Sequence, residues 1–304
     1  MGIFYKGAQK MKIEEIFNQK KTVFSFEIFP PKTTSSIDTI YNTLDELAGL
    51  NPDYISVTYG AGGSVKDNKT VELSSLVKNK YNIEAVAHLT CITSTKEDID
   101  FYLKSLEKNN IENILALRGD IPLDGEVKGE FAHASDLIKY IGNGKFNLAA
   151  ACYPEGHIEN KGLVNEVLSM KRKQDAGASY FISQLFFDNE KFYKFQEEAG
   201  RAGITIPIEA GIMPVTNKKQ IERMVSLSGA SLPKKFIKIM EKYEYDAEAL
   251  RDAGIAYAVE QIVDLVSTGV DGIHLYVMNN KYLANKITSS IKNIIATENK
   301  IQEI

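Results

Sequence analysis

The segment from Thr22 to Thr33, "TVFSFEIFPPKT", has the composition of a buried β-strand that ends abruptly. Its aromatic and β-branched residues favour an extended backbone, and Pro30-Pro31 cannot continue the hydrogen-bond ladder of a sheet. One carboxylate, Glu27, lies just before the end of this strand. Because burying a charge without a partner is costly, this position needs a structural or functional reason.

Strand-like runs of this kind alternate with amphipathic segments along the whole chain. The eight runs are Val23–Phe29, Tyr54–Tyr59, Ala85–Cys91, Ile114–Leu117, Leu148–Tyr153, Tyr180–Phe186, Pro207–Ile212 and Gly272–Val277. The segments between them carry apolar residues three or four positions apart, which predicts helices such as Ser35–Gly49, Lys96–Asn109, Gly162–Ala176 and Asn189–Ala202. Gly49, Gly177 and Gly203 follow these patterns, as left-handed helix caps do.

The strand–helix units recur about every 30 residues, the length of one βαβ step. The strands are almost continuously apolar, so both of their faces should be covered. We therefore predict a single (β/α)8 barrel, of the TIM-barrel type, over residues 1–304, with residues 1–20 as an N-terminal helical extension. Lys218–Leu227 and Ala247–Thr268 are predicted as extra helices before the last strand. An open, doubly wound sheet is the alternative.

The composition is that of a soluble globular protein, with 44% hydrophobic and 25% charged residues. A net charge of −4 without a basic block argues against a nucleic-acid partner. No apolar run reaches the roughly 20 residues that a membrane span needs. Cys91 and Cys152 lie in strand-like stretches, which favours a reducing cytoplasm. The four histidines lack the close spacing of a metal site, so no metal is predicted.

Polar side chains gather where the predicted strands end, the edge at which such barrels carry their active sites. Each could serve an ordinary structural role, but their convergence on one rim predicts a site. The glycine-rich "YGAGGS" (residues 59–64) lacks the ending of a phosphate-binding loop or a Rossmann turn. The rim residues are Glu27, Thr58, Tyr59, His88, Thr90, Arg118, Asp120, Tyr153, Glu155, His157, Gln184, His274 and Tyr276.

Motifs in a fixed order connect the chain to a known family. "FSFEIFPPKT", "SVTYGAGGS", "AHLTC", "ALRGD", "AAACYPEGH", "GIMPVTNKKQ" and "HLYVMNN" make the chain resemble methylenetetrahydrofolate reductase in its short bacterial form. The resemblance implies a barrel that binds FAD, takes a hydride from NADH or NADPH, and reduces 5,10-methylenetetrahydrofolate to 5-methyltetrahydrofolate. It also implies a homo-oligomer, and it leaves the choice of nicotinamide nucleotide open.

The resemblance gives two carboxylates catalytic roles. Glu27 matches the general acid that protonates N10 of the folate, and we expect the rings of Phe24, Phe26 and Phe29 to surround it and favour its neutral form. Asp120 matches an aspartate beside the pterin and the flavin. Its negative charge would stabilise the cationic iminium form of the substrate and depress the flavin potential.

Further residues match the family's binding positions. Met224 departs from the family, which commonly has a phenylalanine there, and Asn280 stands where an arginine is expected. The FAD positions are Thr58, Tyr59, His88, Arg118, Gly119, Asp120, Ala134, Tyr153, His157, Glu166, Ser169, Arg172 and Lys173. The substrate positions are Glu27, Asp120, Gln184, Gln220, Met224, Tyr276 and Asn280.

Two other functional classes remain as alternatives. A barrel lyase or aldolase would need a Schiff-base lysine, and no predicted strand ends in one. A non-catalytic ligand-binding barrel has no use for an acid inside its first strand.

Overall fold

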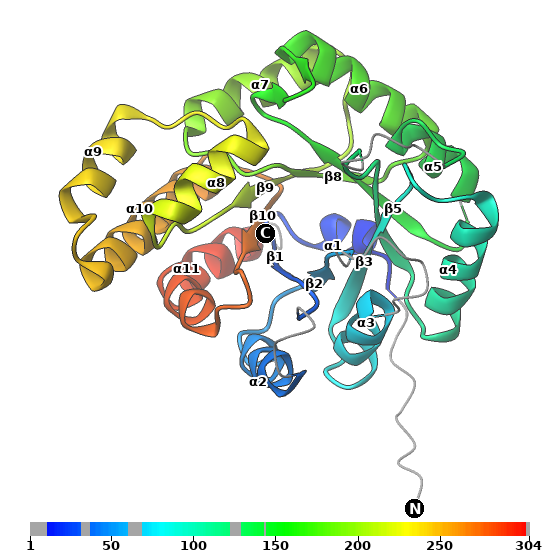
Figure 1. The fold of residues 1–304 in the computed structure, drawn as a ribbon, viewed down its shortest axis with the longest axis horizontal. Coiled ribbons are helices and arrows are strands. Elements are labelled where there is room, and N and C mark those ends of the chain that lie inside the picture. The colour runs from blue at the N-terminus through cyan, green and yellow to red at the C-terminus, as the bar shows by residue number, and fades with distance from the viewer. Residues whose placement is uncertain (1–10, 32–36, 60–68, 122–128, 143, 302–304) are drawn as a thin grey trace, which may run out of the picture.

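The computed structural model describes residues 11–31, 37–59, 69–121, 129–142 and 144–301, and its strands close into a parallel barrel (Figure 1). The strand order is β1-β10-β9-β8-β5-β4-β3-β2. Pairing of the first strand with the last, as in Phe24 opposite Ile273, confirms the barrel and excludes the open sheet. The strands are β1 (Val23–Ile28), β2 (Tyr54–Val57), β3 (Glu84–Thr90), β4 (Asn113–Leu117), β5 (Asn147–Cys152), β8 (Tyr180–Ser183), β9 (Ile208–Ile212) and β10 (Gly272–Tyr276).

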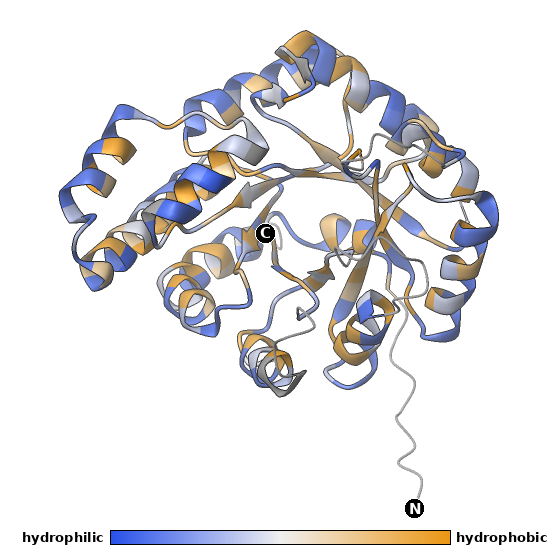
Figure 2. Ribbon diagram, viewed as in Figure 1, coloured by the Kyte–Doolittle hydropathy of each residue, from blue (hydrophilic) through white to orange (hydrophobic). Residues whose placement is uncertain are grey.

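Helices surround the barrel and turn their apolar sides toward it (Figure 2). Three of them, α8 (Lys218–Ser228), α9 (Lys234–Tyr243) and α10 (Ala247–Ser267), lie between β9 and β10. Helices α8 and α10 confirm the two predicted extra helices, and α9 is an additional one. A hairpin of β6 (Gly156–His157) and β7 (Asn160–Lys161) follows β5. The others are α2 (Ile37–Ala48), α3 (Lys69–Asn79), α4 (Lys96–Lys108), α5 (Ala134–Ile141), α6 (Leu163–Ala176), α7 (Asn189–Arg201) and α11 (Lys281–Ile301).

Helix α4 shows how the local sequence fixes these elements. In a capping box, Thr95 Oγ1 accepts from the Asp98 amide, and the Asp98 carboxylate accepts from the Thr95 amide. Ile99, Tyr102 and Leu106, spaced three and four residues apart, are buried against the barrel. Capping and apolar spacing therefore agree on where the helix starts and which face it buries.

A short helix, α1 (Ile13–Gln19), closes the N-terminal end of the barrel. Ile13 and Ile16 pack against side chains inside the barrel, among them Tyr54 and Tyr180. The amide of Ile13 donates to Oδ1 of Asn113, the first residue of β4, at 2.9 Å. Of the predicted extension over residues 1–20, residues 1–10 lie outside the described part of the chain. Because α1 closes the N-terminal end, the opposite, C-terminal end of the barrel remains open for a site.

The predicted glycine caps are partly right. Gly177 and Gly203 have φ angles of +116° and +79°, so both adopt the left-handed conformation. The prediction for Gly49 is wrong, because the left-handed residue after α2 is Asn51, with φ +54°. Asparagine tolerates this region better than other residues with a side chain. The loop after Tyr59, with most of "YGAGGS", lies outside the described residues.

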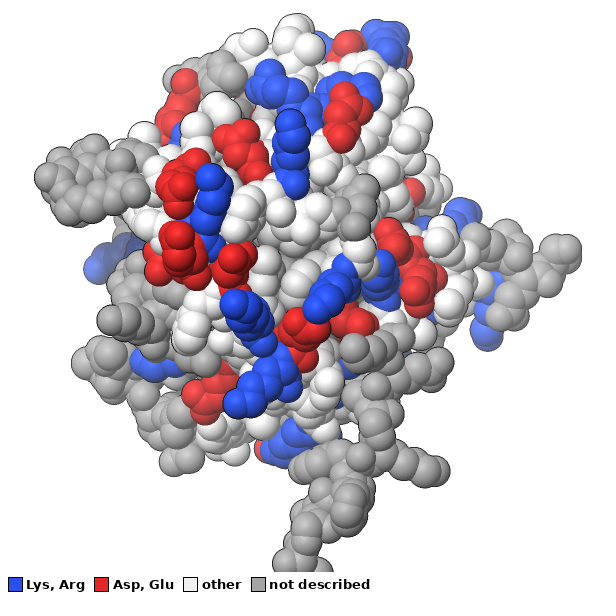
Figure 3. Space-filling view, turned by 90° about the vertical axis from the view of Figure 1, so that its right-hand side faces the viewer, with Lys and Arg blue, Asp and Glu red and all other residues white. Residues whose placement is uncertain are grey.

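The surface carries acidic and basic side chains interspersed on the face that includes α4 and α5 (Figure 3). Lys145 lies 2.6 Å from Glu107, and Lys96 lies 3.3 Å from Glu130. Within the described ranges, no helix combines the length and the hydrophobicity that crossing a bilayer would require.

Candidate active site

A cavity of about 530 Å³ opens at the C-terminal end of the barrel, where the sequence predicted the site. The predicted rim residues line it, apart from Glu155 and His274. Glu155 instead accepts hydrogen bonds from Lys191, at 2.5 Å, and from the Ser231 amide, at 3.0 Å. His274 is fully buried beneath the cavity. The predicted convergence of polar groups is thereby confirmed.

A second cavity of about 270 Å³ adjoins the first, and the two share Arg118, Tyr153 and His157. Its other lining residues come mainly from the start of α5 and from one side of α6. Every residue that the resemblance assigned to FAD lines one of the two cavities. Those found in the smaller one alone are Ala134, Glu166, Ser169, Arg172 and Lys173.

Successive side chains of β1 alternate between the inside and the outside of the barrel. Val23 belongs to the cluster inside the barrel, whereas Phe24 and Phe26 pack in the layer between strands and helices. Ser25 and Glu27 share the inner face with Val23. The expectation that Phe24 and Phe26 surround Glu27 is therefore wrong, because the period of two sends their rings to the opposite face.

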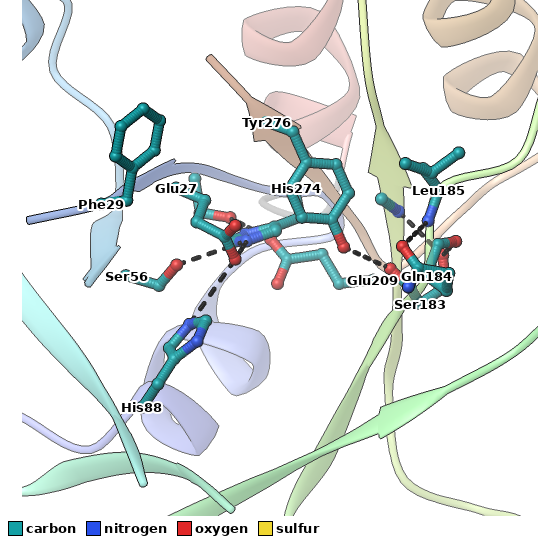
Figure 4. Close-up of polar contacts among 12 residues, drawn as sticks. Glu27, Phe29, Ser56, His88, Ser183, Gln184, Leu185, Glu209, His274 and Tyr276 are labelled. Carbon is teal, nitrogen blue, oxygen red and sulfur yellow. Dashed lines mark hydrogen bonds and ion pairs between the residues drawn. The ribbon is translucent and has the colours of Figure 1, made fainter. Parts of the chain in front are cut away.

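Two histidines are the real neighbours of Glu27 (Figure 4). Its Oε2 lies 3.6 Å from Nε2 of His88 and 3.5 Å from Nε2 of His274. The ring of Phe29 points away from the carboxylate (Figure 4). Burial lowers the pKa of His88 to about 4, so this histidine is neutral at physiological pH. His88 Nε2 is buried without a hydrogen-bond partner among the described residues.

Below Glu27 lies a layer of buried polar groups. Ser25 Oγ donates to Oε1 of Glu209 at 2.7 Å and lies 2.6 Å from Nδ1 of His274. The Tyr54 hydroxyl donates to Oε2 of Glu209. His274 Nε2 lies 3.4 Å from Ser56 Oγ. These contacts join Glu209 to Glu27 through the interior of the barrel.

Glu209 was missed by the sequence analysis. A signal was present, because the run Pro207–Ile212 contains this single acid between apolar residues, as the first strand contains Glu27. Gly272, opposite Glu209 in the register, provides the space: a Cβ there would lie 2.8 Å from Glu209 Cγ.

The raised pKa of Glu209 predicts how stability depends on pH. Burial raises this pKa from 4.5 to about 7. Between these values the folded protein keeps a proton that the unfolded chain has lost, so the stability that Glu209 contributes is lost as pH rises. At 1.36 kcal/mol per pKa unit, the loss is about 3 kcal/mol. The depressed pKa of His88 acts in the opposite direction, so the test compares one variant with the parent, and the contribution of His88, present in both, cancels.

Glu209→Gln removes the group that causes this loss. From pH 4.5 to pH 8, we therefore expect the unfolding free energy of the variant to rise by about 3 kcal/mol relative to that of the parent. Urea unfolding followed by circular dichroism at several pH values measures it. Parallel pH profiles for the two proteins would contradict the prediction.

Gly211 on β9 allows Tyr276 to lie across the barrel. The Tyr276 hydroxyl donates to the Ser183 carbonyl oxygen at 2.7 Å. A Cβ at Gly211 would lie 2.2 Å from that oxygen and 2.8 Å from the Tyr276 ring. Gly211→Ala is therefore expected to cost about 1–3 kcal/mol of unfolding free energy, the usual range for overpacking. Gly200→Ala in α7, where a Cβ meets nothing within 4 Å, is the control, and equal effects in urea unfolding would refute the argument.

The predicted substrate residues divide into two groups. Glu27, Asp120, Gln184 and Tyr276 line the larger cavity, whereas Gln220, Met224 and Asn280 line neither cavity. Gln220 Oε1 accepts from the Thr216 amide at 3.1 Å. Met224 packs against an apolar cluster around α8 and α9. Asn280 Oδ1 accepts from the amides of Tyr282 and Leu283, and so caps the start of α11.

Charged groups border the smaller cavity. The guanidinium group of Arg118 donates two hydrogen bonds to the carboxylate of Glu159, at 2.6 and 2.7 Å. Buried Lys173 donates to the Ala151 carbonyl oxygen at 2.8 Å and lies 3.9 Å from Oε1 of Glu166. That oxygen makes no hydrogen bond within the described residues. The cavity thus offers positive charge and one buried acceptor to a ligand.

Comparison with known proteins places the chain in one family, by a family model and by individual relatives alike. The methylenetetrahydrofolate reductase family model matches residues 12–292. The chain is 36% identical over 284 residues to methylenetetrahydrofolate reductase (NADH) 1 of Arabidopsis thaliana, and it spans 48% of that protein's length, as it spans about half of the similar plant proteins. It is 35% identical over 268 residues to 5,10-methylenetetrahydrofolate reductase of Escherichia coli, covering 88% of this chain and 90% of that one.

A solved structure supports the fold. It is an uncharacterized protein from Clostridium thermocellum that binds two copies of 5-methyl-5,6,7,8-tetrahydrofolic acid. The TM-score is 0.71 at 17% sequence identity, with 94% of this chain and 99% of that one covered. At this identity the likeness shows the shared architecture alone.

Proposed function

This chain belongs to the methylenetetrahydrofolate reductase family, and from that premise we propose that it reduces 5,10-methylenetetrahydrofolate to 5-methyltetrahydrofolate. The proposed reaction is ping-pong, with NADH or NADPH as donor and FAD as the bound cofactor. The observation that carries the proposal is the placement of Glu27, Asp120 and Gln184 on one cavity that adjoins a cationic one.

The two adjoining cavities fit FAD by their chemistry. Arg118, Arg172 and Lys173 border the smaller cavity and offer the positive charge that a pyrophosphate needs. The unpartnered Oε1 of Glu166 is an acceptor for a ribose hydroxyl or an adenine amino group. When bound, FAD would supply the hydride carrier between nicotinamide and folate. The larger cavity would hold the isoalloxazine ring and the pterin.

We assign the proton transfer to Glu27. Opening the five-membered ring of the substrate requires a proton on N10, and a carboxylic acid inside the cavity can supply it. His88 is neutral and places an unpartnered nitrogen toward the carboxyl group, so it cannot neutralise Glu27 by ion pairing at neutral pH. The Glu27 side chain is one-fifth exposed, which leaves it accessible to the ligand.

Two further side chains would recognise the substrate. Asp120 is exposed at the cavity, where its negative charge would stabilise the cationic iminium that forms on ring opening. Gln184 presents an amide that can donate and accept, and its Oε1 accepts from the Leu185 amide at 2.9 Å, which fixes the orientation of the group. This leaves the NH₂ of Gln184 to donate to the pterin.

The structure gives no support to the lyase alternative. Within the described residues, no lysine lines the larger cavity, and a Schiff-base mechanism requires one.

Purified protein tests the proposal directly. We expect it to take up FAD with the absorption spectrum of a bound flavin, to lose that colour anaerobically with NADH or NADPH, and to regain it with methylenetetrahydrofolate. Comparing the two nicotinamide nucleotides in the first step identifies the donor, and light scattering after gel filtration tests the expected homo-oligomer. A protein that takes up no FAD would refute the proposal.

A further inference from the structure

Glu209 is a second carboxyl group beneath Glu27 that lines neither cavity. It is fully buried on β9, and both of its oxygens are hydrogen-bonded, to Ser25 and to Tyr54. Substrate has no route to contact it. A buried acid is costly unless it is neutral or well paired, and a hydrophobic side chain would fill the same space more simply. Its presence therefore calls for a role that an apolar residue lacks.

Glu209 is connected to Glu27 by groups that can each donate and accept a proton. Ser25 Oγ lies 2.7 Å from Glu209 Oε1 and 2.6 Å from Nδ1 of His274. The other ring nitrogen of His274, Nε2, lies 3.5 Å from Oε2 of Glu27. This last distance is slightly long for a hydrogen bond, and catalytic contacts commonly shorten when the substrate binds.

Two arrangements of the network contain the same number of protons. In the first, Glu27 carries the acid proton, Nδ1–H of His274 donates to Ser25, and Ser25 donates to ionised Glu209. In the second, Glu209 carries the proton and donates to Ser25, Ser25 donates to Nδ1, and Nε2–H donates to ionised Glu27. Moving one proton along each hydrogen bond interconverts them, and His274 stays neutral in both.

We propose that Glu209 is a positioning residue that stores a proton and returns it to Glu27 through Ser25 and His274. After Glu27 has given its proton to N10 of the substrate, the shift from the second arrangement to the first makes Glu27 an acid again and leaves Glu209 ionised. Only the catalytic consequence rests on the proposed function, since the exchange of the proton is a property of the protein alone.

The neighbouring titratable groups do not compete for this proton. Burial raises the pKa values of Tyr54, Tyr180 and Tyr276 well above that of free tyrosine, so these hydroxyls keep their protons. His88, which faces Glu27 from β3, has a pKa near 4 and stays neutral. Asp53, which acts on Glu209 from the start of β2, is paired with Lys20. Glu209, His274 and Glu27 are thus left to exchange the proton, and the pKa of Glu209 near 7 suits a group that must give one up.

Infrared spectroscopy of the protein without ligands tests the coupling. The carbonyl stretch of a protonated carboxyl group, followed against pH, should show one buried acid titrating near neutral pH, and Glu209→Gln should remove it. Glu27→Gln should shift the midpoint of that titration by at least half a pH unit. Ser25→Ala, which breaks the connection, should abolish the effect of Glu27→Gln and provides a second route if Glu209→Gln does not fold.

Asp271→Asn is the matched control. This carboxylate precedes β10, accepts from the Ile208 amide at 2.8 Å, and lies outside the network, so its removal should leave the midpoint in place. A midpoint that is unchanged by Glu27→Gln would overturn the proposal.

Kinetic measurements distinguish a failure of the proton transfer between Glu209 and Glu27 from a failure of the proposed function. In Glu209→Gln, we expect folate reduction to slow by about tenfold or more and its pH profile to lose one ionisation, while reduction of flavin by the nicotinamide is unchanged. If the flavin reacts with the nicotinamide and the folate, but parent and variant have superimposable pH profiles, the proton transfer from Glu209 is refuted and the proposed function stands. Infrared coupling without any flavin chemistry would refute the proposed function alone.

Discussion

Replacing Glu27 with glutamine is expected to abolish folate reduction while leaving the reduction of flavin by the nicotinamide nearly unchanged. The first of these steps needs a proton on N10 of the substrate, and the second needs no proton from the protein. Glutamine has almost the same shape as glutamate and can still contact His88 and His274, so the cavity should keep its form. Loss of a general acid typically slows a reaction by about 10²- to 10⁴-fold.

Stopped-flow measurement of the two half-reactions decides this prediction. Glu84→Gln is the matched control, because Glu84 begins β3 at the far end of the barrel and pairs with Lys78. It should leave both half-reactions at parent rates. An equal loss in both half-reactions of Glu27→Gln would mean that the residue shapes the site instead of donating a proton.

The strands and the rim could be predicted because parallel barrel strands are buried on both faces. Such strands appear in the sequence as apolar runs, and any polar residue near their ends becomes conspicuous, as Gln184 does after "YFIS". Chain direction then places all of these ends on one side of the barrel. Closure of the barrel follows from the number of strand–helix units. The exact ends of the helices depend instead on local backbone geometry, and after α2 the left-handed residue is Asn51 and not Gly49.

The surroundings of each site residue could not be predicted in the same way. Glu27 was expected among phenylalanines that are its neighbours in sequence, but its neighbours in space come from β3 and β10. Contacts across the barrel depend on the register of the strands, and the register depends on closure of the whole sheet. The pairing of Ser25 with both Glu209 and His274, from β9 and β10, is of this kind. Residue types at strand ends thus predicted which side chains gather at the cavity, and only the structure gave the connections between them.

Asp120→Asn is expected to slow folate reduction and to make the flavin potential more positive. Asp120 lines the larger cavity beside Arg118, whose guanidinium group already makes two hydrogen bonds to Glu159. Because that positive charge is paired, the charge of Asp120 remains available to act on the ligands. Asparagine keeps the size and removes the charge, so the cationic iminium loses a stabilising neighbour and the reduced, anionic flavin loses a repelling one.

We expect folate reduction by Asp120→Asn to slow by about 10²- to 10³-fold, since electrostatic groups of this kind contribute about 2.7–4 kcal/mol. The potential should rise by roughly 30 mV or more, equivalent to about 1.4 kcal/mol for a two-electron couple. Photoreduction with a reference dye measures the potential, and Glu84→Gln again provides the control. A slower reaction at an unchanged potential would place Asp120 on the substrate alone. An unchanged rate with a raised potential would place it on the flavin alone, and either result would contradict one charge acting on both ligands.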